Sequence, residues 1–264
     1  MDVVSVDREV LFTRREGEPT ARALVCVNAI GTDLRLWEDL VPYLSDAWRV
    51  VRHDTRGHGL STGAHPPPDL DTLADDVAAV MDQSDTGPAV VLGCELGAAT
   101  ALVLAGRRPD LVAGLVLTGA AARAANVVDW RGRMARVRAG GIDAIADEVL
   151  ADWLPARFRA ARPHETRLWR TMLTRTPPAG LAAAAGVLAD ADAGGYADRV
   201  PVPTLLLVGG EAAAGWRRAT AEVGARIAGA EATTIADAAL LTHVAQPAPT
   251  AAAIVAFLER NGLD

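Results

Sequence analysis

The sequence predicts an α/β fold, in which a mostly parallel β-sheet carries helices on both faces and a helical lid is inserted. Two observations carry this prediction. Short β-rich apolar runs alternate with segments of helical periodicity, and the runs are apolar almost throughout, as in strands that are buried on both faces. The strand signals stop between residues 122 and 199 and then return. We therefore expect residues 1–121 and 200–264 to form the core and residues 122–199 to form the lid.

The apolar runs and the helical periodicity give the elements in order. The expected strands are 23–28, 49–54, 89–93, 111–118, 204–208 and 231–235. The expected core helices are 36–44, 70–81, 96–105, 214–228 and 247–261, and Asp69 or Asp71 is placed to cap the second of these. The expected lid helices are 131–138, 142–154, 165–173 and 180–188.

Composition excludes several classes of function. A net charge of -7 leaves no basic face to bind nucleic acid. All 26 cationic residues are Arg, so a Schiff-base lysine is excluded. No apolar run is long enough to span a bilayer, and the N-terminus lacks a basic and apolar leader. We expect a cytoplasmic protein that acts on a small molecule without cofactor, metal or membrane, and we leave a homodimer open.

Three motifs follow successive strands and carry a family resemblance. Residues 28–37 read NAIGTDLRLW, residues 54–61 read DTRGHGLS, and residues 93–97 read GCELG, where a nucleophile elbow G-x-S-x-G would lie. Together they resemble the 3-oxoadipate enol-lactonase branch of the α/β-hydrolase superfamily. This resemblance implies the α/β-hydrolase fold and covers nearly the whole chain.

The same resemblance implies a Ser–acid–His triad that this chain lacks. Glu95 stands at the nucleophile position, Ala212 at the acid position and Leu240 at the position of the general-base His. The oxyanion-hole position is retained, and three residues are expected to line the hole and pocket: Ala29, Ile30 and Leu96. The scaffold therefore persists while the residues for ester hydrolysis are absent.

Five further residues are candidates for contact with a substrate: Trp130, Arg133, Trp153, Leu240 and His243. Four of them, all except Leu240, have a plainer alternative. The two Trp could pack the lid, and Arg133 could lie on a solvated helix face instead of holding a carboxylate. His243 follows Thr242, a plausible N-cap, and is then expected at the exposed first turn of the last helix. We expect His53, His65 and His164 at the surface or in turns, and His58 in a structural role.

Glu95 limits the mechanism. An elbow carboxylate lies near a helix N-terminus, which lowers its pKa, whereas burial raises the pKa, and the sequence does not decide between them. A covalent ester on Glu95 could not be cleared without a His, so we expect general acid–base catalysis. The first hypothesis is a non-hydrolytic, biosynthetic enzyme that catalyses cyclisation, isomerisation or elimination. The alternatives are an inactive pseudo-hydrolase that binds a small molecule or a protein, and a residual lactone or ester hydrolase with an unusual catalytic group.

Overall fold

The computed structural model describes residues 2–63 and 65–264. Within these residues, eight strands form one sheet in the order β1-β2-β4-β3-β5-β6-β7-β8. The strands are β1 (Asp2–Val6), β2 (Glu9–Glu16), β3 (Ala23–Val27), β4 (Arg49–His53), β5 (Ala89–Cys94), β6 (Val112–Thr118), β7 (Thr204–Gly209) and β8 (Glu231–Ile235). β1 and β2 pair antiparallel with their neighbours, and all other pairs are parallel. The predicted α/β fold with a mostly parallel sheet is confirmed.

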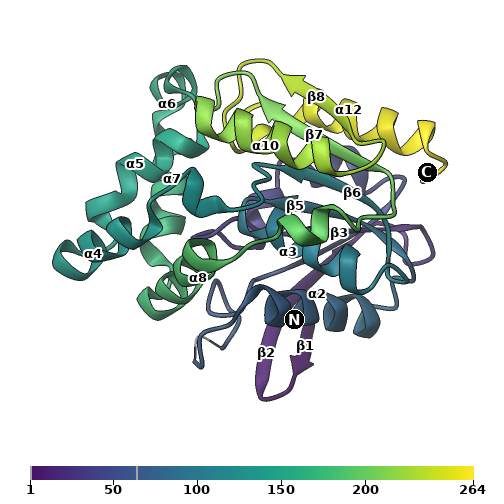
Figure 1. Ribbon diagram of the computed structural model, residues 1–264, viewed down its shortest axis with the longest axis horizontal. Helices are drawn as coiled ribbons and strands as arrows, with labels where there is room; N and C mark the ends of the chain where they lie inside the picture. Colours follow the sequence, from purple (N-terminus) through teal and green to yellow (C-terminus); the bar gives the residue numbers. More distant parts are fainter. Residues whose placement is uncertain (1, 64) are drawn as a thin grey trace.

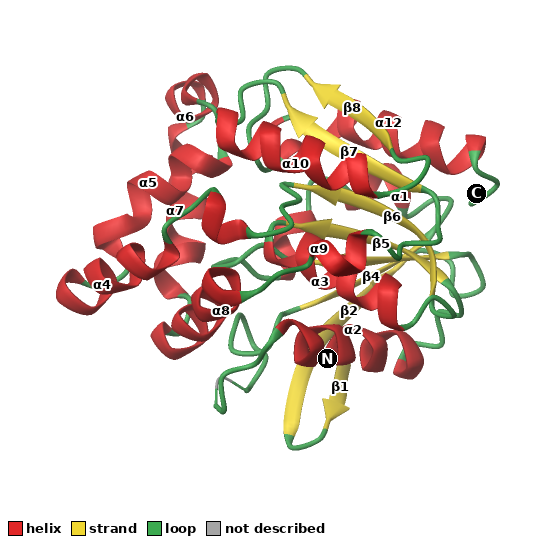
Figure 2. Ribbon diagram, viewed as in Figure 1, coloured by secondary structure: helices red, strands yellow, loops and turns green. Residues whose placement is uncertain are grey.

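Helices cover both faces of this sheet (Figures 1 and 2). One face carries α2 (Leu70–Gln83), α3 (Leu96–Arg107), α9 (Gly194–Ala197) and α10 (Ala214–Arg226), and the other carries α1 (Val41–Leu44) and α12 (Pro247–Arg260). The strands β3 and β5 at the centre are buried along their whole length. This explains why their sequences are apolar at every position rather than at alternate ones.

In the N-terminal third, one element was not predicted and one prediction was wrong. The β1–β2 hairpin was not expected, because its exposed edge carries charged residues that weaken the apolar signal. The expected helix 36–44 is instead a 3-10 turn, η1 (Leu34–Trp37), followed by the four-residue α1. Asp33 caps η1 by accepting the Arg35 N–H, and Pro42 starts α1 afresh because it lacks an N–H.

The insertion between β6 and β7 is helical throughout its regular structure in the described residues. It contains η2 (Ala124–Asn126), α4 (Trp130–Gly140), α5 (Asp143–Trp153), α6 (Ala156–Ala161), α7 (Pro163–Arg175) and α8 (Pro178–Asp190) before α9. Helices α4, α5, α7 and α8 pack on one another beyond one end of the sheet (Figure 1), whereas α9 packs on α3 and α10. The insertion therefore lies at the end of the sheet where β5 and β6 finish.

The turn at 54–61 is built by Asp54. Its carboxylate accepts the N–H groups of Leu34 at 2.8 Å and Leu60 at 2.7 Å, so it joins two loops. Gly59 has a φ of 53°, and a Cβ there would overlap the Asp54 carboxylate, which requires glycine. His58 is buried in this turn, with Nδ1 3.2 Å from the Arg56 carbonyl oxygen. These contacts support the structural role expected for His58.

Candidate active site

Glu95 occupies a sharp turn between β5 and α3. Its φ is 51° and its ψ is -102°, a conformation that costs a non-glycine residue roughly 1–3 kcal/mol. Gly93 and Gly97 make the turn possible, because a Cβ on Gly97 would overlap the Val27 carbonyl and one on Gly93 would crowd Gly97. The Glu95 N–H donates to the Thr118 carbonyl at 3.0 Å. The backbone therefore holds the Glu95 side chain in one place at the end of the sheet.

The Glu95 carboxyl is buried and has its pKa raised to about 8. Burial is the largest cause; Arg133 lowers the pKa, Asp152 raises it, and a hydrogen bond from the Ile30 backbone N–H lowers it. Among the described residues, Glu95 Oε2 has no hydrogen-bond partner. Burial therefore outweighs the opposing effects, and Glu95 holds a proton near neutral pH.

A cavity of about 10 Å³, enough for roughly one water molecule, adjoins Glu95. Its walls are mostly small and apolar, and they include Leu70, Gly119, Ala191 and Trp216. The buried indole Nε1 of Trp216 has no hydrogen-bond partner in the described part of the chain. The sequence alone did not identify Trp216 as a site residue, although its place in the first turn of a helix after β7 was a usable signal.

Residues 212 and 240 also lie at this end of the sheet. Ala212 follows β7, and it lines one small cavity together with Leu240 and Trp216. The Leu240 carbonyl accepts the Thr118 hydroxyl at 2.8 Å, and a Cβ on Gly119 would collide with the Leu240 side chain. Because Thr118 also bonds the Glu95 N–H, residues 95, 212 and 240 converge around the end of β6. The neighbouring Glu211 lines neither of these small cavities, and its carboxylate lies 3.8 Å from Arg157.

The three predicted oxyanion-hole residues differ in their contacts. Ile30 contacts the Glu95 carboxyl through its backbone N–H. The Ala29 carbonyl instead accepts the Thr32 hydroxyl at 2.7 Å in the same loop. Leu96 lines a different small cavity, between β3 and α2. Of these three, Ile30 is the one whose backbone N–H bonds to the Glu95 carboxyl.

Arg133 is buried in the insertion, so its expected alternative on a solvated helix face was wrong. Its Nε donates to Glu148 at 2.9 Å, and its Nη2 donates to Asp152 at 2.5 Å. Its guanidinium also lies 5.0 Å from the centre of the Trp130 ring. The guanidinium fork therefore already has two carboxylate partners, which sequence reasoning missed because they lie 15 and 19 residues away.

Trp130 and Trp153 are both almost completely buried. Trp153 lies against the 28–37 loop, since a Cβ on Gly31 would be 3.8 Å from its ring. Its carbonyl accepts the Leu241 N–H at 3.0 Å, which ties the insertion to the loop after β8. Neither Trp lines the cavity beside Glu95. Both positions agree with the packing alternative.

The predictions for two histidines were wrong. His243 is buried, and its ring stacks on Trp37 with centroids 4.3 Å apart. It lies within the short helix α11 (Thr242–Ala245), whose N-cap is Leu241 rather than Thr242. His53 is buried at the end of β4, where its carbonyl accepts the Asn28 side chain at 2.7 Å. Neither residue lines the cavity beside Glu95.

The described residues contain no group of three or more metal-ligating side chains that could hold an ion. Within residues 2–63 and 65–264, no helix is both long and apolar enough to cross a membrane.

The sheet order, the strained elbow after β5 and the helical insertion after β6 define an α/β-hydrolase scaffold. Residues 22–177 match the family model described as alpha/beta hydrolase fold, and the chain belongs to this family. The fold expected from the three motifs is thereby confirmed.

The relatives include lactonases and esterases. 3-oxoadipate enol-lactonase 2 of Acinetobacter baylyi is 28% identical over 195 residues, which cover 74% of this chain and 73% of that protein. A pimeloyl-[acyl-carrier protein] methyl ester esterase of Neisseria meningitidis is 29% identical over 216 residues, with 75% and 78% covered. The crystal structure of the enol-lactonase from Burkholderia xenovorans LB400 superimposes with a TM-score of 0.91, at 30% identity, over 98% of this chain and 100% of that one. The expected resemblance to enol-lactonases is confirmed.

Proposed function

We propose that this protein is a non-hydrolytic enzyme of the α/β-hydrolase family, in which Glu95 is the general acid–base group. The observation that carries the proposal is the buried Glu95 carboxyl, whose pKa is about 8 and whose Oε2 has no partner in the described structure. A general acid–base group works best when its pKa lies near the working pH. A buried polar atom without a partner is otherwise a cost to folding.

The first supporting step is the replacement of the triad. Glu95, Ala212 and Leu240 hold the three positions that the resemblance assigns to the nucleophile, the acid and the base. Ala212 cannot orient a base, and Leu240 cannot activate a water. An alkyl ester formed on Glu95 would therefore persist, so catalytic turnover by hydrolysis is not expected.

The second step is the proton balance. Protonated Glu95 donates a proton to one atom of the bound molecule and recovers a proton from another, so no water is consumed. Isomerisation, elimination and ring closure all fit this exchange.

The alternatives have weaker support. The Glu95 side chain makes no capping hydrogen bond to α3, so a purely structural cap is not favoured. The small size of the adjoining cavity does favour a pseudo-hydrolase that only binds. Residual hydrolysis would need a His, and His243 is packed against Trp37 instead. A cytoplasmic, biosynthetic role, a homodimer and a lid at 122–199 stay predictions.

The test compares wild type with Glu95→Gln on three substrate panels: hydroxy-epoxides for ring closure, β,γ-unsaturated ketones for isomerisation and β-hydroxy ketones for elimination. We expect wild-type turnover on one panel, reduced about two to four orders of magnitude by Glu95→Gln. Turnover that survives the substitution, or products that contain an added water, would refute the proposal. Absence of turnover on all panels, with Glu95→Gln destabilising the fold, would favour the pseudo-hydrolase.

A further inference from the structure

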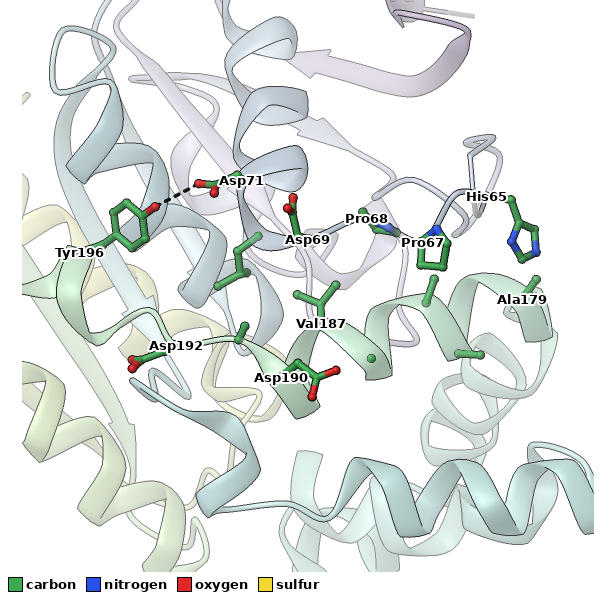
Figure 3. A pocket seen from close by; sticks show the side chains of 15 residues that line it. His65, Pro67, Pro68, Asp69, Asp71, Ala179, Val187, Asp190, Asp192 and Tyr196 are labelled. Atoms are coloured by element: carbon green, nitrogen blue, oxygen red, sulfur yellow. Dashed lines mark hydrogen bonds between the residues drawn. The ribbon is translucent and has the colours of Figure 1, made fainter.

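A large cleft in the described residues lies apart from the small cavity beside Glu95. It measures about 700 Å³ and opens between the segment around His65–Asp71 and helix α8 (Figure 3). This volume lies within the range of about 300–1,000 Å³ that is usual for small-molecule sites. The cleft is therefore large enough for a substrate, whereas the cavity beside Glu95 has room only for the reacting group.

One wall of the cleft is the small-residue face of α8. The lining positions are spaced three and four residues apart, which places them on one side of the helix: Ala179, Ala182, Ala183, Gly186 and Val187. The facing wall contributes Pro67, Pro68 and Leu70, with the two prolines opposite the helix in Figure 3. Both walls are apolar, so the body of a bound molecule must be apolar as well.

The rim of the cleft is acidic. It contains Asp69, Asp71, Asp190 and Asp192, and among the described lining residues there is no Arg. Three of these carboxylates pair with Arg residues outside the cleft: Asp71 with Arg107, Asp190 with Arg131 and Asp192 with Arg123. Asp71 also accepts the Tyr196 hydroxyl at 3.1 Å (Figure 3), and Asp69 accepts the Thr72 N–H at 2.8 Å. A carboxylate can accept more hydrogen bonds than these. The rim therefore suits hydroxyl or ammonium donors and disfavours an anion.

Two residues connect the cleft to the catalytic site. Leu70, the first residue of α2, and Ala191, which follows α8, line both the cleft and the cavity beside Glu95. Leu70 is nearly buried and forms a partition between the two spaces. Beyond this partition, Glu95 Oε2 is buried without a partner in the described structure.

We propose that the cleft between residues 65–71 and α8 binds the substrate, and that its reacting end reaches Glu95 past Leu70 and Ala191. The substrate is a mainly apolar small molecule that carries hydroxyl or ammonium donors and no carboxylate. Its orientation toward Glu95 rests on the proposed function. Binding in the cleft does not, because it involves neither the elbow nor the proton of Glu95.

The binding test uses three probes of one shape and different charge: 2-naphthylethylamine, 2-naphthylethanol and 2-naphthylacetate. Affinity is measured by isothermal titration calorimetry. We expect the amine and the alcohol to bind at least about tenfold more tightly than the acetate. Equal or tighter binding of the acetate would overturn the proposal, as would no binding of any probe.

The location is tested with Gly186→Leu. A Cβ on Gly186 meets nothing within 4 Å, and Leu is a better helix former than Gly, so the variant should fold. Its side chain fills the cleft, and we expect a loss of probe affinity of at least about tenfold. Leu60→Ala, in a separate cleft of about 500 Å³, is the matched control and should leave affinity unchanged. If Gly186→Leu unfolds normally and its affinity for the probes is unchanged, the probes bind outside this cleft and the proposal is wrong.

Two further results separate this proposal from the proposed function. Glu95→Gln should bind the amine and the alcohol as wild type does, even if it abolishes turnover. In wild type, bound amine should lower the pKa of the Glu95 carboxyl, followed as the infrared band that Glu95→Gln removes, because a nearby cation favours the carboxylate. Binding without this shift would contradict the connection past Leu70 and Ala191.

Discussion

The His243 imidazole lies flat against the Trp37 indole, with ring centroids 4.3 Å apart and planes inclined by 13°. The stack fixes α11 against the loop that carries Ile30, and Trp37 is held in turn by donating its Nε1–H to Asn28 at 2.8 Å. His243 Nε2 has no partner among the described residues, and burial lowers the pKa of His243 to about 3. The stack therefore contains a neutral His that the unfolded chain would protonate in mild acid.

The first prediction is that His243→Phe makes the protein less sensitive to acid. The folded pKa lies below the unfolded value of 6.5, so this group's contribution to stability is full above pH 6.5 and is lost as pH falls toward about 3. The slope is at most about 1.4 kcal/mol per pH unit. Chemical denaturation at pH 4.5, 5.5 and 7 should show that the free energy of unfolding of the variant rises relative to that of wild type as pH falls. His164→Gln, at an exposed position, is the control, and parallel curves for His243→Phe and wild type would contradict the prediction.

The second prediction is the opposite pH dependence for Glu95→Gln. The folded pKa of Glu95 is raised from 4.5 to about 8, so its contribution to stability is full below pH 4.5 and declines as pH rises to about 8. The variant should therefore gain stability relative to wild type between pH 5 and pH 8.5. Urea unfolding at both pH values measures this difference, with the exposed Glu222→Gln as control. A constant difference would mean that Glu95 is ionised throughout.

The third prediction concerns Arg133. Replacement by Met leaves Glu148 and Asp152 without their shared partner in a partly buried setting, and it should destabilise the fold by about 1–3 kcal/mol. It should also raise the pKa of Glu95, since Arg133 lowers that pKa. Arg136→Met removes an exposed partner of Glu148 and should cost less than about 1 kcal/mol. Equal losses of stability from the two substitutions would show that burial of Arg133 does not increase its contribution to the free energy of unfolding.

The fourth prediction is that no serine is activated. The chain contains four: Ser5, Ser45, Ser61 and Ser84. The hydroxyl of Ser61 donates to the Asp54 carbonyl at 2.7 Å, and none of the four lines the cavity beside Glu95. Fluorophosphonate labelling and turnover of nitrophenyl esters and 3-oxoadipate enol-lactone should all be absent. Stoichiometric labelling mapped to a serine would refute this.

The matched positive variant combines Glu95→Ser, Ala212→Asp and Leu240→His. Because residues 95, 212 and 240 converge around the end of β6, the combined variant should become reactive toward fluorophosphonate while Glu95→Ser alone does not. Labelling of Glu95→Ser at the same rate would show that positions 212 and 240 take no part. A folded triple variant that is never labelled would contradict the assignment of these positions to the triad.

Much of the scaffold was predictable because its signals are local. Strands such as β3 and β5 are apolar at every position, since both of their faces are buried. Gly93 and Gly97 mark a turn in which the backbone packs too closely for a side chain at either position. The position of Glu95 at the elbow follows from the same short motif. The β1–β2 hairpin was not predictable in this way, because an edge strand with polar residues has no comparable signal.

What the sequence by itself determined is the α/β-hydrolase fold, the place of Glu95 within it and the absence of a serine there. Only the tertiary structure decided which effect controls the pKa of Glu95, because Ile30, Arg133 and Asp152 are distant in sequence and burial depends on all of them. The same reason applies to His243 and Arg133, whose environments come from the loop at 28–37 and from α5. The periodicity of a sequence reports on one helix or strand at a time. Burial and charge pairing depend instead on how several helices and strands pack together.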